Sequence, residues 1–244
     1  MIKFFRNIRK KLINRGKTTN YLKYAIGEII LVVIGILIAL QINNWNENRK
    51  LQSQELKLLS DIKSNLEVTL KNFIKDTIAN TNYIAEYHKI ETYITKDLPY
   101  SNELDIPFGM LQYWNSPYIT STGYKTLQTK GLDIIKNETL KNDIVNLYEV
   151  QFSLLTIDYD KSEWNLNQIV VAPFYGKHIR RYNDKSLNIA IPNDFERLKH
   201  NDEFLNILSM IIRLRKKGVL FYRETMIPLQ KLINDIDSEL KARA

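Results

Sequence analysis

The sequence predicts a mainly α-helical protein in which a single transmembrane helix near the N-terminus is followed by an elongated antiparallel helical bundle. An uninterrupted apolar run, long amphipathic stretches and two connectors rich in Pro and Gly lead to this fold class. The predicted organisation is a basic tail over 1–23, a transmembrane signal-anchor helix over 24–43 and an extracytoplasmic helical-bundle domain over 44–244.

The net charge of +8 is concentrated in the tail. Eight Lys and Arg residues precede the first acidic residue, Glu28. They are Lys3, Arg6, Arg9, Lys10, Lys11, Arg15, Lys17 and Lys23. Removing these eight from the total of 35 leaves 27 basic residues, which equals the 27 acidic ones. The rest of the chain therefore offers no general field for a polyanion, and we expect no nucleic-acid partner.

The apolar run over 25–42 contains only two strongly polar residues, Glu28 and Gln41. Aromatic residues flank it, and Tyr24 and Trp45 would stand about 31 Å apart in a helix, close to the hydrocarbon thickness of a bilayer. A buried helix of a soluble protein is the alternative. The apolar surface on all sides and the adjacent basic tail favour a membrane span.

The positive tail predicts a cytoplasmic N-terminus and an exported C-terminal domain. A cleaved signal peptide is the competing interpretation, but the run ends in Leu-Gln-Ile-Asn-Asn over 40–44, without a small-x-small cleavage site. The span is therefore expected to remain as an uncleaved anchor in the lipid bilayer.

Glu28, Gly35 and Ala39 are the candidate site residues within the span. Small residues allow close approach of a second helix, and a membrane glutamate seeks a polar partner, so these residues form a candidate transmembrane helix interface. Alternatively, Glu28 reaches the headgroups and the small residues are ordinary membrane residues. Both interpretations stay open.

The opening of the chain, KFFRNIRKKL over 3–12 and YAIGEIILVVIGILIALQINNWNENRK over 24–50, resembles that of a bacterial family known only as a domain of unknown function, number 6090. A looser resemblance continues through 120–149. It implies a single-pass protein of the bacterial inner membrane with a periplasmic domain, and it implies no activity, ligand or catalytic residue.

The periodicity after Trp45 predicts a long helix that ends before Pro99, and a Tyr- and Asn-rich connector follows it. A short helix over 120–130 is expected to close at Gly131, and Asn137 is the expected N-cap of a further helix.

A second irregular connector is expected over 172–200, with a short strand over 187–191. The last helix is expected to begin at about Asp202, and Gly218 and Pro228 should weaken or kink it.

No pattern in the sequence indicates catalysis. The chain has no Cys, its eight Gly are too far apart for a phosphate-binding loop or a nucleophile elbow, and His88, His178 and His200 lack metal-ligand spacing. We therefore expect no enzymatic activity, no cofactor and no metal.

Two kinds of surface residue are candidates for recognition. The aromatic residues Tyr113, Trp114 and Tyr118 could contact a partner, or they could cap the end of the bundle core. The basic clusters over 177–181 and 213–217 could bind phosphates or acidic glycans, but a solvated helix face is the favoured interpretation.

The leading hypothesis is an anchored envelope protein whose periplasmic bundle binds a ligand or a protein. The protein partner could be a membrane protein, a periplasmic protein or a second copy of the chain. The alternatives are a membrane-anchored periplasmic hydrolase with a site built from dispersed carboxylates, and a homo-oligomeric subunit of a membrane complex.

Overall fold

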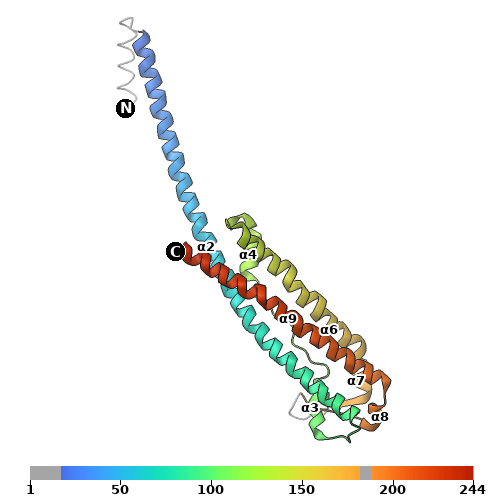
Figure 1. The fold of residues 1–244 in the computed structure, drawn as a ribbon. Coiled ribbons are helices and arrows are strands. Elements are labelled where there is room, and N and C mark those ends of the chain that lie inside the picture. The colour runs from blue at the N-terminus through green and yellow to red at the C-terminus, as the bar shows by residue number, and fades with distance from the viewer. Residues whose placement is uncertain (1–17, 182–187, 244) are drawn as a thin grey trace. The chain divides into compact units, whose positions relative to one another are not determined.

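The computed structural model describes residues 18–181 and 188–243, and the chain divides into two compact units, Met1–Glu55 and Leu56–Ala244. The fold is mainly α-helical, as predicted (Figure 1). Most of the predicted basic tail lies outside the described residues. Helix α2 (Thr18–Thr95) contributes residues to both units.

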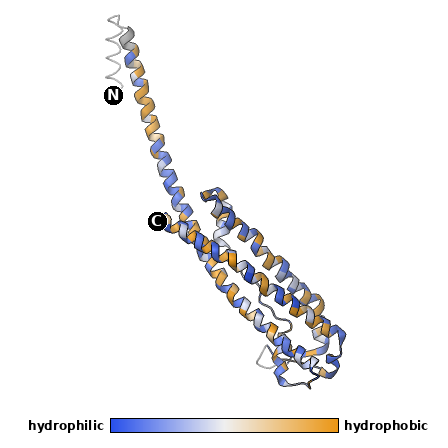
Figure 2. Ribbon diagram, in the orientation of Figure 1, coloured by the Kyte–Doolittle hydropathy of each residue, from blue (hydrophilic) through white to orange (hydrophobic). Residues whose placement is uncertain are grey.

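In the first unit, α2 contains a segment long and apolar enough to cross a membrane. Figure 2 shows this segment as mainly hydrophobic. Its apolar window has a mean hydropathy of 2.6, and none of that window is buried. Leu31 and Ile29, for example, are exposed on opposite sides of the window. Within the first unit, this segment is therefore not a buried core helix.

The second unit is built around three long helical stretches. Figure 1 shows the part of α2 in this unit, a helical rod over 138–178 and α9 (Asp202–Ala242) lying lengthwise beside one another. The rod is continuous but alternates between α-helix and the wider π-helix. Its parts are α5 (Glu138–Asn146), η3 (Leu147–Gln151), η4 (Leu154–Asp160), α6 (Lys161–Leu166), η5 (Asn167–Val171) and α7 (Ala172–His178), of which the η segments are π-helical.

Shorter elements close the ends of the unit. The connector after α2 holds η1 (Asn102–Leu104) and α3 (Asp105–Met110), and α4 (Thr122–Lys130) and η2 (Leu132–Ile134) precede the rod. Strands β1 (Ile179–Arg181) and β2 (Ala190–Pro192) pair antiparallel, with Arg180 opposite Ile191, and α8 (Phe195–Lys199) leads into α9.

Local signals set most helix ends where the sequence predicted them. Asn137 accepts a hydrogen bond from the Leu140 N–H at 3.1 Å and so caps α5. Asn201 caps α9 in the same way through Phe204. Gly131 ends α4 with φ +95°, a backbone conformation that residues other than Gly rarely adopt.

The prediction of an irregular connector was wrong for residues 172–178, which complete the rod as α7. Pro173 lies inside the continuous rod, as the second residue of α7 directly after the π-helical η5. The wider turn of η5 changes the backbone hydrogen-bond pattern that a proline would interrupt in a regular α-helix. The predicted strand is present as β2, displaced toward its C-terminal end. Helix α9 runs without interruption through Gly218 and Pro228.

Two apolar clusters form the core of the second unit. One joins α2, α4, the first half of the rod and the last part of α9 around Phe73, Tyr159 and Tyr222. The other joins the end of α2, α3, α7, the strands and the start of α9 around Tyr87, Phe108 and Phe204. Burial of these side chains is the main stabilising contribution to the bundle.

Gly218 is required by the packing of α9 against η4. A Cβ atom at this position would lie 2.2 Å from Cε2 of the Tyr159 ring, closer than real contacts allow. Tyr159 is itself fully buried, so its ring has little freedom to move away. The glycine therefore sets how closely the two helices approach.

We expect Gly218→Ala to lower the free energy of unfolding by about 1–3 kcal/mol through overpacking. Thermal unfolding of the full chain in a neutral detergent measures this loss as a fall in the melting temperature of roughly 2–4 °C per kcal/mol. The matched control is Gly176→Ala, because a Cβ there meets no atom within 4 Å. Equal melting temperatures for the two variants would contradict the packing argument.

Candidate recognition site

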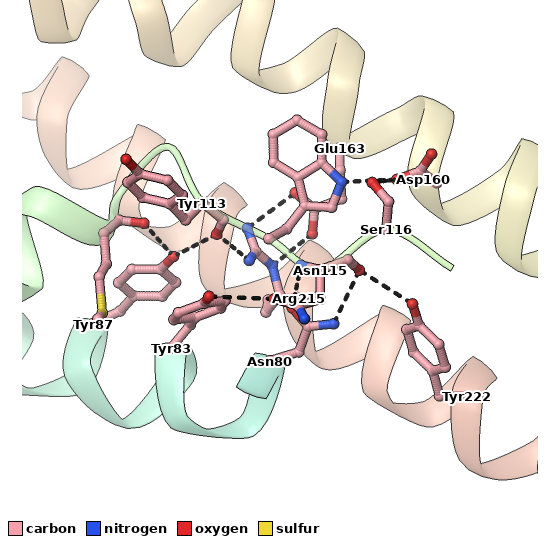
Figure 3. Close-up of polar contacts among 12 residues, drawn as sticks. Asn80, Tyr83, Tyr87, Tyr113, Asn115, Ser116, Asp160, Glu163, Arg215 and Tyr222 are labelled. Carbon is pink, nitrogen blue, oxygen red and sulfur yellow. Dashed lines mark hydrogen bonds and ion pairs between the residues drawn. The ribbon is translucent and has the colours of Figure 1, made fainter. Parts of the chain in front are cut away.

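A buried ion pair joins α9 to the rod at the centre of the second unit (Figure 3). Arg215 Nε donates to Glu163 Oε1 at 2.8 Å and Nη2 donates to Glu163 Oε2 at 3.3 Å. The two side chains are 2% and 3% exposed. This paired geometry gives each charge a partner away from water, which is the condition under which buried charges are tolerated.

The same guanidinium also holds the connector that follows α3. Arg215 Nη1 donates to the Tyr113 carbonyl oxygen, which lies 3.1 Å from the Tyr87 hydroxyl as well. The Tyr83 and Tyr87 rings each have their centroid 5.9 Å from Arg215 Cζ, a cation–π distance. Arg215 therefore contacts α2, the rod and the connector at once.

Asn115 fixes the next part of the connector. Its backbone N–H donates to Asn80 Oδ1 at 2.9 Å, and its carbonyl accepts from the Tyr222 hydroxyl at 3.1 Å. Its side-chain amide donates to Asp76 Oδ1 at 3.0 Å. Figure 3 shows Asn80 of α2 and Tyr222 of α9 meeting Asn115 of the connector. Hydrogen bonds to side chains thus satisfy the backbone of Asn115, which belongs to no helix or strand.

Trp114, which directly precedes Asn115 on the connector, pairs with Trp164 of α6. Trp114 Nε1 and Ser116 Oγ both donate to Asp160 Oδ1, at 2.8 and 2.7 Å. The Trp114 ring lies edge-on to the Trp164 ring, with centroids 6.4 Å apart. Trp164 is 57% exposed, and Tyr118, farther along the connector, is 75% exposed. We call Trp114 and Trp164 the aromatic surface.

Burial controls the titration of the acids beneath this surface. It raises the pKa of the Glu163 carboxyl, and the charge and hydrogen bonds of Arg215 oppose that rise. It also raises the pKa of Asp76, against hydrogen bonds from Asn115 and Tyr222. Both oxygens of Glu163 are occupied by Arg215, so this arrangement suits a structural role better than proton transfer.

The structure places the sequence-predicted aromatics in different environments. Tyr113 is half-buried and contributes chiefly its carbonyl, while its ring lies under the Arg181 guanidinium at 5.4 Å. Trp114 is anchored by Asp160, and Tyr118 is the most exposed of the three. Trp164, which the sequence analysis did not single out, completes the aromatic surface.

The predicted residues of the span belong to the first unit. Gly35 and Ala39 are exposed, and a Cβ atom at Gly35 would meet nothing within 4 Å. Glu28 is partly exposed. The helix interface that these three residues would form stays a prediction.

The solvated-face interpretation of the second basic cluster was wrong for Arg215. Arg213, Lys216 and Lys217 are exposed, but Arg215 points into the core. The available signal was its spacing, four residues from both Ile211 and Val219 on the buried stripe of α9. In the first cluster, Arg181 Nη2 donates to the Gly109 carbonyl at 3.1 Å and so has a structural contact.

The described residues contain no group of three or more His, Asp or Glu side chains placed to hold a metal ion. Residues 28–177 match the model of a protein family whose description is Family of unknown function (DUF6090). The chain belongs to the DUF6090 family. The resemblance noted from the sequence is thereby confirmed. No curated protein and no solved structure matches the chain.

The part matched to DUF6090 contains the connector, Trp114, Asp160, Glu163 and Trp164. It ends before α9 and therefore leaves out Arg215. The aromatic surface of this DUF6090 protein thus lies within the matched region, whereas the cation that holds the connector beneath it lies outside.

We expect Arg215→Met to lower the free energy of unfolding by about 3–5 kcal/mol, because Glu163 would be left buried without a counter-charge. Replacing both residues, Arg215→Met with Glu163→Met, should restore much of that loss. Denaturant unfolding of the full chain measures the cycle. Lys216→Met is the exposed control and should change stability by less than about 0.5 kcal/mol. Additive losses in the double variant would argue against an ion pair.

Proposed function

We propose that this DUF6090 protein is a single-pass protein of the bacterial inner membrane whose periplasmic bundle binds a protein partner through the aromatic surface. The observation that carries the binding proposal is the exposed Trp164 ring set against the anchored Trp114. Tryptophan and tyrosine supply large contact areas at low entropy cost, and such residues dominate the energetics of many interfaces.

The anchoring part of the proposal is supported by the fully exposed apolar window of α2. An apolar surface of this kind is unfavourable in water and favourable in lipid. The eight cations that precede Glu28 support a cytoplasmic N-terminus.

The non-enzymatic part of the proposal is supported by the contacts of buried Glu163 and half-buried Asp160. Both carboxylate oxygens of Glu163 accept hydrogen bonds from Arg215, and Asp160 accepts hydrogen bonds from Trp114 and Ser116. A general acid or base needs an accessible proton, so these carboxyls are better suited to hold the aromatic surface in place.

The topology can be tested with single cysteines, since the native chain has none. A membrane-impermeant maleimide should label Asn142→Cys but not Asn14→Cys in spheroplasts, and the reverse in inverted inner-membrane vesicles. Asn142 is exposed on α5, so its labelling does not require unfolding. Labelling of Asn14→Cys from the outside would refute the proposed orientation.

Partner binding can be tested by crosslinking the tagged full chain in native membranes. We expect Trp164→Ser to weaken capture of the partner about tenfold or more, since a central tryptophan typically contributes at least about 2 kcal/mol. Ile227→Ser is the control, because Ile227 is a comparably exposed apolar residue on α9. Equal capture by both variants would remove the aromatic surface as the binding site.

A further inference from the structure

A groove of about 750 Å³ lies between the rod and the first half of α9, entirely within the second unit. Its volume is in the range of small-molecule sites. Its apolar lining consists of Leu166, Ile169, Val170, Met210 and Leu214. Ile169 is 73% exposed and Met210 is 48% exposed, so no other part of the described chain covers the groove. An uncovered apolar concavity of this size indicates a ligand or partner.

The packing of the two helices accounts for the groove. Gly218 lets α9 approach η4 closely at Tyr159, and packing against α9 loosens toward η5. Ile169 and Val170 belong to η5, where the π-helical backbone is wider and changes the direction of successive side chains. The groove is therefore part of the regular backbone geometry of the unit and does not depend on a loop.

One rim of the groove is cationic. Arg213 and Lys217, one helical turn apart on α9, both line it. Within the described ranges, neither side chain forms an ion pair, and Lys217 Nζ lies 5.0 Å from the Phe221 ring centroid. Two like charges at this spacing repel each other, and an anion between them would relieve that repulsion. The neutral polar residues Ser162 and Asn165 also line the groove.

We propose that this groove binds a single-chain anionic amphiphile, a long-chain fatty acid, with its acyl chain along the apolar lining and its carboxylate between Arg213 and Lys217. Charge complementarity selects the anionic head group, and the continuous apolar lining selects the chain. Met210 adds a flexible wall that can adapt to an acyl chain. The site is separate from the aromatic surface, since Trp164 does not line the groove.

The test uses the purified full chain in a neutral detergent and two photoreactive probes, a diazirine-bearing palmitic acid and the corresponding diazirine-bearing hexadecanol. Peptide mass spectrometry maps the adducts. With the acid probe we expect adducts on the segments that carry Ile169 or Met210, at a yield at least about tenfold above that of the alcohol. Adducts in the apolar window of α2 should form with both probes and serve as an internal reference.

Arg213→Glu with Lys217→Glu should reduce the groove adducts of the acid probe about tenfold or more and leave the α2 adducts unchanged. Lys216→Glu with Arg223→Glu is the matched control, because these residues are also exposed on α9 but do not line the groove. Circular dichroism melting verifies that all four substitutions leave the fold intact.

Three results would overturn the proposal. The acid and alcohol probes could label the groove equally, the double charge reversal could leave groove labelling unchanged, or adducts could form only in α2. The last result would favour an acidic protein helix as the occupant. None of these results bears on the maleimide topology or on the effect of Trp164→Ser, so failure here is distinguishable from failure of the proposed function.

Discussion

The connection between Arg215 and its partners is the constraint on which the second unit depends. A guanidinium buried to this extent is unstable without a counter-charge, so α9 and the rod must lie where Glu163 can meet it. Because the third branch of the guanidinium holds the Tyr113 carbonyl, the path of the connector is determined by the same side chain. The apolar clusters supply most of the stability, whereas this polar contact selects one arrangement among the packings that they allow.

The contact between Arg215 and the Tyr113 carbonyl also helps to fix the position of the aromatic surface. After Tyr113, the connector alternates between two anchors. Trp114 and Ser116 donate to Asp160, and Asn115 between them is held by α2 and α9. A binding surface whose backbone and Trp114 ring are already ordered loses little entropy when a partner docks. The exposed Trp164 ring rests on the rod, so both tryptophans are presented by rigid elements.

Local chemistry made the helix ends predictable from the sequence. Asn137 and Gly131 act through their own backbone and a few neighbours, and the start of α9 was likewise correct because Asn201 caps it locally. The ion pair was not predictable, since Glu163 and Arg215 are 52 positions apart and a charge on an apolar stripe does not reveal its partner. The π-helical segments also escaped prediction, because an apolar stripe at helical spacing does not distinguish the wider π-helix from the α-helix.

The basic cluster over 213–217 shows why overall charge is a poor guide to local recognition. Beyond residue 23 the chain is formally neutral, so the domain as a whole has no net positive charge to attract anions. Helix geometry nevertheless separates the cations of this cluster, since residues two apart face different directions. Arg215 forms an ion pair with Glu163 inside the unit, while Arg213 and Lys217 line the groove. An anion site can therefore arise from two side chains in a neutral domain, provided that the backbone also leaves an apolar concavity beside them.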